Sequence, residues 1–118
     1  HCFTGTVAEC EQWLGLGAYV GITGIVTYKN AADVQAAARA IPADRLLVET
    51  DAPYLSPEPV RKVKPNEPAF VAHTAGCVAG LRGITPDELA RLTTANAGRF
   101  YGEKLTAVQS SFGASFPS

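Results

Sequence analysis

The stretch that decides the fold is Leu46-Leu47-Val48-Glu49-Thr50-Asp51-Ala52-Pro53-Tyr54. Its three apolar residues form the short run that is typical of a buried parallel strand, and two carboxylates separated by one threonine follow at once. Pro53 cannot donate a ladder hydrogen bond, so the chain is expected to turn outward there. In β/α proteins this arrangement delivers an acidic side chain to the carboxyl end of a strand, where such folds place their chemistry. Taken alone, the same residues could simply end a strand in a solvated turn.

The flanking sequence predicts alternating helices and strands. Apolar residues at helical spacing, with Trp13 expected in the core, indicate a first helix near 7–14, and glycines stop it. Strands are predicted at 18–26 and 45–50, with Gly21 and Gly24 marking places where another group approaches the backbone. Further helices are predicted at 30–41, at 70–81 and from residue 86 onward. Asn30 is the expected N-cap of the helix at 30–41, and Gly83 is expected to end the helix at 70–81. Thr85-Pro86-Asp87-Glu88 forms a capping box at the start of the helix from 86. Thr93 or Thr94 is expected to cap a shorter last piece that ends near 101.

The longest irregular segment is predicted at residues 52–66, which contain four prolines. Prolines impose extended or turning backbone, and loops of this length inside compact β/α domains are usually functional or disordered. Because the segment follows directly on Asp51, we interpret it as a functional loop. The overall alternation with otherwise short connections indicates an α/β fold with a parallel sheet.

Composition describes a globular chain: 118 residues, 47% hydrophobic and 18% charged, with a net charge of −1. An eight-fold β/α barrel needs about 250 residues, so a whole barrel cannot be present. Nucleic-acid binders usually carry a basic patch, and the only dense one here is Arg61-Lys62-Val63-Lys64. The three cysteines lack C-x-x-C spacing, which argues against a disulfide framework or a zinc site and favours a reducing compartment. Glycines interrupt the longest apolar stretch, so no membrane span is expected.

Five motifs, in order and at compatible intervals, resemble those of the TatD family of metal-dependent deoxyribonucleases. They are His1-Cys2-Phe3-Thr4-Gly5, Ile22-Thr23-Gly24-Ile25-Val26-Thr27-Tyr28-Lys29-Asn30, the stretch 46–54, Asn66-Glu67-Pro68 and Thr93-Thr94-Ala95-Asn96-Ala97. The resemblance covers residues 1–102 and implies a TIM-like (β/α)8 barrel about twice as long as this chain. We therefore expect a partial barrel made of the carboxy-terminal β/α units only, with residues 103–118 as a loose tail.

The resemblance implies that His1 and Asp51 are metal-site residues at the carboxyl ends of two strands. Imidazole nitrogen and carboxylate oxygen suit Mg²⁺, Mn²⁺ or Zn²⁺, of which two ions are expected in the complete protein. Asp51 is also the expected catalytic residue, because it can orient the attacking water or accept its proton. A lone His1 would more simply be a solvated terminal histidine. The family's other ligands, an H-x-H pair, a glutamate and a further histidine, have no counterpart in this sequence.

Two further motifs leave alternatives open. Glu49 lies two residues before Asp51, so on a strand both would face the same side. Glu49 could support the site by contacting a metal ligand without binding the metal itself. Alternatively, it could anchor the barrel interior by pairing with a buried donor. Thr4 and the following glycine stand near the start of a helix, where backbone amides and a hydroxyl could bind phosphate or simply cap the helix.

Arg61, Asn66 and Glu67 resemble the family's R-x-x-x-N-E-P loop. Arg61 could brace this loop by pairing with Glu67, or it could meet a substrate phosphate. The neighbouring Lys62 and Lys64 are expected in solvent, where at most they steer an anionic strand.

The activity that the resemblance implies is 3′-directed exonuclease hydrolysis of DNA phosphodiesters by metal-activated water, on single-stranded or damaged DNA, in the cytoplasm. DNA is then the partner of the complete protein, and no membrane is involved. A second reading is an inactive β/α fragment that folds by self-association or by pairing with the missing amino-terminal part. A third keeps the barrel but changes the substrate, since metal-dependent barrels also hydrolyse amides and lactones.

Overall fold

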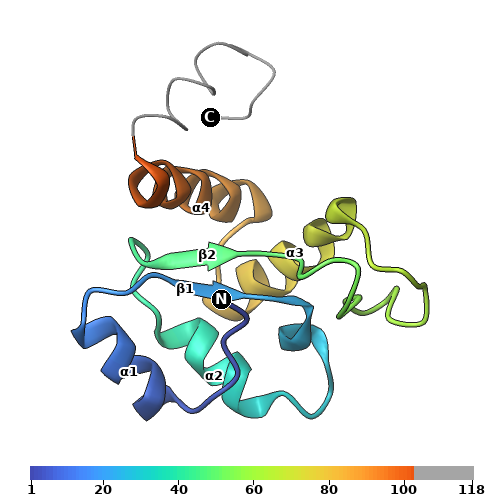
Figure 1. Ribbon diagram of the computed structural model, residues 1–118, viewed down its shortest axis with the longest axis horizontal. Coiled ribbons are helices and arrows are strands. Elements are labelled where there is room, and N and C mark those ends of the chain that lie inside the picture. The colour runs from blue at the N-terminus through green and yellow to red at the C-terminus, as the bar shows by residue number, and fades with distance from the viewer. Residues whose placement is uncertain (103–118) are drawn as a thin grey trace.

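The computed structural model describes residues 1–102, which form an α/β structure with four α-helices around a two-stranded parallel sheet (Figure 1). The predicted tail, 103–118, lies outside the described residues. The elements in chain order are α1 (Val7–Gly15), β1 (Val20–Ile22), the 3₁₀ helix η1 (Gly24–Thr27), α2 (Ala32–Ala40), β2 (Leu46–Val48), the 3₁₀ helix η2 (Pro68–Phe70), α3 (Val71–Arg82) and α4 (Pro86–Tyr101). The expected α/β class is confirmed.

The sheet fixes the direction in which the two strands deliver side chains. β1 and β2 are parallel, with Val20 opposite Leu46 and Ile22 opposite Val48. The first residues of the chain lie at the other edge of β1, where the amide of Phe3 donates to the carbonyl oxygen of Gly21 at 2.9 Å. They form no strand, so the described sheet has two parallel strands, whose carboxyl ends lie at one edge.

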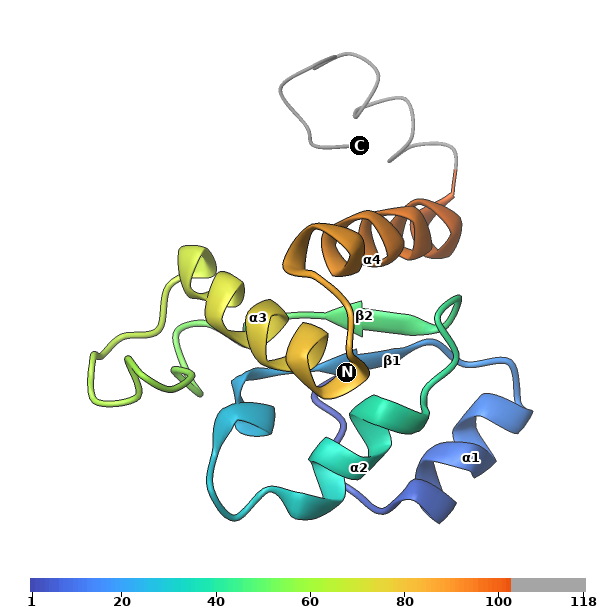
Figure 2. The same ribbon diagram turned by 180° about the vertical axis from the view of Figure 1, so that it is seen from behind.

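Helices cover the sheet on both sides, as Figures 1 and 2 show from opposite directions. α1 and α2 lie on one side, α4 lies on the other, and α3 packs against both α2 and α4. All three residues of β1 are buried, and Leu46 is fully buried at the start of β2. Continuous burial is what a parallel strand covered on both faces requires, so the prediction is confirmed for β1. In β2 only Leu46 is fully buried, and Leu47 and Val48 are half-buried.

A buried asparagine from α4 ties that helix to the sheet. The side-chain amide of Asn96 donates to the carbonyl oxygens of Ala43 at 2.7 Å and Leu46 at 2.8 Å. Ala43 precedes β2, and Leu46 is its first residue. Without Asn96 these two carbonyls would lack this hydrogen-bond partner at the start of the strand. Leaving such an acceptor unpaired costs about 1–3 kcal/mol, which explains why a polar side chain occupies a core position.

The predicted helix ends are confirmed where a local signal specifies them. Thr85 accepts a hydrogen bond from the amide of Glu88 at 3.1 Å, while the Glu88 carboxylate accepts one from the amide of Thr85. Thr6 and Glu9 form a second capping box that starts α1. Gly83 ends α3 in the left-handed conformation, with φ of 68°.

Several predicted boundaries were wrong. α2 begins at Ala32 after Ala31, so Asn30 is not its N-cap. α4 continues through Thr93, whose hydroxyl donates to the carbonyl oxygen of Leu89 within the helix at 2.9 Å instead of capping a new one. The predicted strands 18–26 and 45–50 shorten to three residues each. After β1 the chain coils into η1, because Gly24 lies against the backbone of the long loop.

Gly24 shows why β1 stops. A Cβ added at this position would lie 2.6 Å from the carbonyl oxygen of Leu55, a backbone atom that cannot move away cheaply. The predicted close approach at Gly24 is thus confirmed, and the approaching group is the 52–66 loop. Trp13, in contrast, is 57% exposed, so its predicted place in the core was wrong. Within residues 1–102 no helix is both long and apolar enough to cross a bilayer.

Replacing Thr85 with alanine is expected to lower the free energy of unfolding by about 1 kcal/mol, because the N-cap oxygen of α4 is lost. Chemical denaturation at fixed protein concentration measures the change. Thr94→Ala removes the same atoms from the interior of the same helix, where no capping bond exists, and should change stability by less than about 0.5 kcal/mol. Equal effects of the two substitutions would contradict the capping role.

Candidate metal centre

His1, Glu49 and Asp51 meet at the carboxyl end of the two parallel strands. Nδ1 of His1 lies 2.8 Å from Oε1 of Glu49, and its Nε2 lies 3.5 Å from Oδ1 of Asp51. The side chains of Glu49 and Asp51 are 26% and 32% exposed, whereas the imidazole of His1 is largely exposed. The expected approach of His1 and Asp51 is confirmed, although their role stays a prediction.

Glu49 contacts both the first residues of the chain and β1. It follows β2, and its Oε1 accepts a hydrogen bond from the amide of Cys2 beside His1. A Cβ at Gly21 in β1 would lie only 2.7 Å from Oε2 of Glu49, so glycine makes room for this carboxylate. The sequence indicated a close approach at Gly21 but gave no sign of what approaches. Because Glu49 faces Nδ1, it orients the ring so that Nε2 points toward Asp51.

Asp51 owes its direction to a turn, not to strand alternation. β2 ends at Val48, and Asp51 has a φ of 55°, a left-handed conformation that is uncommon outside glycine. Glu49 and Asp51 do lie near the same imidazole, but the expected reason, alternation along one strand, was wrong. The left-handed conformation at Asp51 turns its side chain toward His1 instead.

Asn66 fixes this turn from the far end of the long loop. Its side-chain amide donates to the carbonyl oxygens of Thr50 at 2.9 Å and Tyr54 at 2.7 Å, and its backbone amide donates to Pro53 at 2.9 Å. These three bonds, here called the Asn66 clamp, bracket Asp51 on both sides. Asn66 is only 4% exposed, and its Oδ1 is a buried acceptor without a hydrogen-bond partner among the described residues. Asn66 is thus a bracing residue near the site.

The remaining predicted residues lie elsewhere. Thr4 is exposed and precedes the true N-cap, Thr6, by two residues, so the alternative that Thr4 caps the helix was wrong, and its phosphate-binding role stays a prediction. Arg61 does not pair with Glu67: its guanidinium carbon lies 3.7 Å from the centre of the Tyr28 ring. Glu67 is exposed and makes no ion pair within residues 1–102. The structure therefore brings together His1, Glu49 and Asp51, and keeps Thr4, Arg61 and Glu67 outside that cluster. Sequence reasoning missed Tyr28, because nothing in its motif indicates which cation lies over the ring.

Two of the cysteines are poor candidates for catalysis. All three are free thiols. Burial raises the pKa of the Cys10 and Cys77 thiols, so both are protonated at neutral pH and poorly nucleophilic.

The donor set suits part of a divalent-metal site. An imidazole nitrogen and carboxylate oxygens are ordinary ligands for such ions, and Gly21 leaves room for the carboxylate that orients the imidazole. In the portion that the structure describes, however, no group of three or more histidine, cysteine, aspartate or glutamate side chains is arranged to hold an ion by itself. His1 and Asp51 fit as contributors to a site that needs further ligands.

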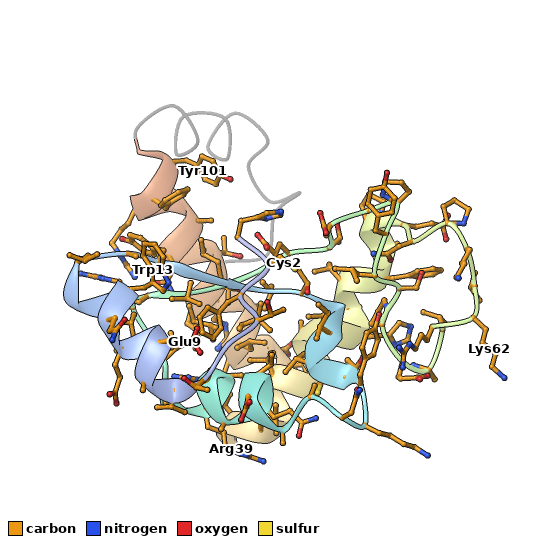
Figure 3. The ribbon with its side chains drawn as sticks, turned by 60° about the horizontal axis from the view of Figure 1, so that its bottom comes forward. Cys2, Glu9, Trp13, Arg39, Lys62 and Tyr101 are labelled. Atoms are coloured by element: carbon orange, nitrogen blue, oxygen red, sulfur yellow. The ribbon has the colours of Figure 1, made fainter. Side chains whose placement is uncertain are left out.

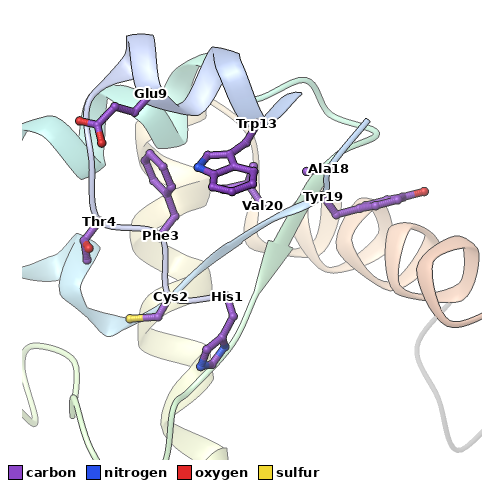
Figure 4. Close-up of a pocket in the computed structure, with 9 residues that line it drawn as sticks. All are labelled: His1, Cys2, Phe3, Thr4, Glu9, Trp13, Ala18, Tyr19 and Val20. Atoms are coloured by element: carbon purple, nitrogen blue, oxygen red, sulfur yellow. The ribbon is translucent and has the colours of Figure 1, made fainter. Parts of the chain in front are cut away.

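A hollow of about 420 Å³ lies beside His1. Figure 4 shows the residues that line it, with His1 on one side and Trp13 and Tyr19 away from it. Thr4 lines this hollow and also a second one that reaches the long loop. The surface next to His1 is therefore indented.

Comparison with known proteins places this geometry in a family. The family described as TatD related DNase matches residues 1–102. The uncharacterized metal-dependent hydrolase YcfH of Escherichia coli K12 is 46% identical over 110 residues, covering 93% of this chain and 41% of the relative. A protein named 3′-5′ ssDNA/RNA exonuclease TatD from Erwinia billingiae is 46% identical over 105 residues, covering 86% of this chain and 40% of that one.

Solved structures agree. The crystal structure of YJJV, a TatD homologue from Escherichia coli K12, superposes with a TM-score of 0.76 at 30% identity and covers 83% of this chain but 38% of that one. The chain thus spans about two-fifths of the length of the relatives that it matches. Both the sequence match and the fold lead to the same assignment, and the chain belongs to the TatD-related DNase family.

Proposed function

We propose that this chain is the carboxy-terminal part of a longer TatD-type barrel and supplies part of a divalent-metal site that hydrolyses phosphodiester bonds in nucleic acid. The observation that carries the proposal is the meeting of His1 and Asp51, from distant parts of the chain, at 3.5 Å on the carboxyl edge of parallel strands. The relatives' lengths support the partial barrel, since this chain covers only about 40% of each.

In this proposal each side chain of the cluster has its own task. Asp51 and Nε2 of His1 are ligands, and Glu49 holds the imidazole so that Nε2 is the free nitrogen. A bound divalent ion lowers the pKa of a water molecule and stabilises charge that develops on the phosphate. The Asp51 carboxylate has a second oxygen with which to orient the attacking water and take up its proton. The ions would be Mg²⁺, Mn²⁺ or Zn²⁺, two in the complete protein, with further ligands from residues beyond this cluster.

The printed names of the relatives support the substrate and the metal separately. YcfH is named a metal-dependent hydrolase, and the Erwinia protein is named a 3′-5′ exonuclease of single-stranded DNA and RNA. We infer a single nucleic-acid strand as the substrate and shortening from its 3′ end as the reaction. Three free thiols are typical of a reducing compartment, which favours the cytoplasm as its place of action.

The test uses the full-length protein that carries this chain, stripped of metal with a chelator. A single-stranded oligonucleotide labelled at its 5′ end should shorten stepwise only after Mg²⁺, Mn²⁺ or Zn²⁺ is restored. Blocking the 3′ end should stop the reaction if cleavage begins there. Hydrolysis of amides or lactones with no cleavage of any nucleic acid under these conditions would contradict the proposed substrate.

Replacing Glu49 with glutamine is expected to weaken metal binding by about 10- to 100-fold, the usual cost of losing the partner that orients a ligating histidine. Glutamine keeps the size that Gly21 accommodates but removes the charge that faces Nδ1 of His1. Competition with a chelating dye measures the affinity without relying on turnover. Glu11→Gln, an exposed position on α1, removes the same charge away from the site and should leave the affinity unchanged.

A further inference from the structure

Tyr28 forms a rigid aromatic surface beneath the long loop. The residue is only 9% exposed, and its hydroxyl donates to the carbonyl oxygen of Ser56 at 2.9 Å. The side-chain amide of Gln35 donates to the Tyr28 carbonyl oxygen at 3.3 Å and to that of Val26 at 3.0 Å. Bonds at both the backbone and the hydroxyl leave the ring no freedom to turn, so whatever packs on it is held in a defined position.

Arg61 lies over this ring and forms no ion pair with a carboxylate among residues 1–102. Its guanidinium carbon is 3.7 Å from the ring centre, within cation–π range, while the residue as a whole is exposed. A guanidinium has five N–H donors in a planar fork, so its contact with Tyr28 leaves donors that can bind a phosphate through two parallel bonds.

Arg61 and Tyr28 both line two neighbouring hollows. One, of about 980 Å³, is lined also by Lys62, Lys64 and Glu58. The other, of about 500 Å³, extends to Thr4 and Gly5. Since Thr4 also lines the hollow that contains His1, the shared residues connect the candidate metal centre to the basic part of the loop.

The charge along this path favours an anion at the loop end. Three basic side chains, Arg61, Lys62 and Lys64, share the hollow of about 980 Å³ with one acidic side chain, Glu58. The whole chain is slightly negative, with a net charge of −1, so this local excess of positive charge is not a property of the surface in general. Exposed lysines alone would only attract an anion, whereas the fixed guanidinium provides a position for it.

We propose that Arg61, held on Tyr28, binds a backbone phosphate of a single nucleic-acid strand several nucleotides away from the bond that is cut. The inference rests on the proposed function and adds to it the path that the strand follows, from the His1–Asp51 edge past Thr4 to the long loop. Arg61 is a substrate-binding residue in this scheme and has no part in the bond cleavage itself. Lys62 and Lys64 supply further attraction beyond it.

The binding test uses the full-length protein with its metal removed by a chelator, so that the strand is bound but not cut. Fluorescence anisotropy measures the affinity for a labelled single-stranded oligonucleotide of about twelve nucleotides at several salt concentrations. Arg61→Gln is expected to weaken binding by about tenfold and to reduce the slope of log K against log salt by about 0.7, the loss of one phosphate contact.

Two variants separate a specific contact from a general loss of charge. Arg39→Gln removes a cation from the exposed end of α2, far from Lys62 and the loop in Figure 3, and should change neither affinity nor slope. Arg61→Lys keeps the charge but lacks the planar fork, so its affinity should fall between wild type and Arg61→Gln with a nearly unchanged salt slope. If Arg61→Gln does not fold, as circular dichroism would show, the affinity of Arg61→Lys relative to wild type decides the question.

A catalytic measurement keeps this inference distinct from the proposed function. A small activated phosphodiester, which has no neighbouring phosphates, should be hydrolysed equally well by wild type and Arg61→Gln. Equal oligonucleotide affinity for Arg61→Gln and Arg39→Gln would overturn the inference and leave Arg61 as a residue that only pins the loop, while hydrolysis would still support the function. Failure of wild type to hydrolyse any phosphodiester would instead overturn the function itself, and the inference with it.

Discussion

Asp51→Asn in the full-length protein is expected to lower the rate of phosphodiester hydrolysis by about a hundredfold or more while leaving the fold intact. Loss of a residue behind the ligands already costs 10- to 100-fold, so loss of a ligand should reach at least the upper end of that range, about 100-fold. Asparagine has the size and hydrogen-bonding capacity of aspartate but lacks the negative charge that a cation requires. The Asn66 clamp bonds only to backbone atoms around residue 51, so it should survive the substitution.

The measurement compares initial rates at saturating Mg²⁺ and Mn²⁺, together with circular dichroism and the melting temperature. Asp44→Asn serves as the control, because Asp44 is exposed and its ion pair with Arg45 at 3.2 Å lies on the surface, where such pairs contribute little. Its rate should match wild type. A wild-type rate for Asp51→Asn under the same conditions would show that Asp51 has no catalytic role.

The 118-residue chain by itself is expected to have no measurable nuclease activity and to associate with copies of itself or with the amino-terminal part of the barrel. Its described residues contain no cluster able to hold a metal ion alone. In that same portion β2 pairs only with β1, which leaves an unpaired strand edge, and large apolar side chains such as Leu16 and Tyr101 are exposed. Unpaired edges and exposed apolar surface both favour association.

Size-exclusion chromatography with light scattering over a dilution series tests association, and a metal-supplemented digestion of single-stranded DNA tests activity. The full-length protein, assayed in parallel, is the positive control for the digestion. A well-folded monomer of this chain that degrades DNA, and loses that activity in Asp51→Asn, would show that the chain suffices.

Much of the fold follows from signals that are local in the sequence. The apolar run at 46–48 predicts β2, the capping box at Thr85 predicts the start of α4, and Gly83 predicts the end of α3. The meeting of His1 and Asp51 was predictable for a related reason, because the carboxyl ends of parallel strands share one edge of a sheet. In each case a short segment and one general rule are sufficient.

The features that the sequence did not reveal depend on partners far along the chain. β1 stops at Ile22 because the backbone of Leu55 occupies the space beside Gly24. Arg61 lies over Tyr28, 33 positions earlier in the sequence, although a carboxylate six residues away was the simpler expectation. Asp51 faces His1 through a left-handed turn that Asn66 stabilises from the other end of the loop. Helical and strand periodicities carry no information about such contacts.

The Asn66 clamp has a consequence for how the loop tolerates a change of length. Because its bonds join Asn66 to Thr50, Pro53 and Tyr54, they close the loop at its base, and residues 55–65 lie between the joined ends. Lengthening a loop that is already closed costs little, about 0.6 kcal/mol for each doubling. A change of length in this segment is therefore expected to leave the turn at Asp51 in place, while it disturbs the contact of Leu55 with Gly24 and those of Ser56 and Arg61 with Tyr28.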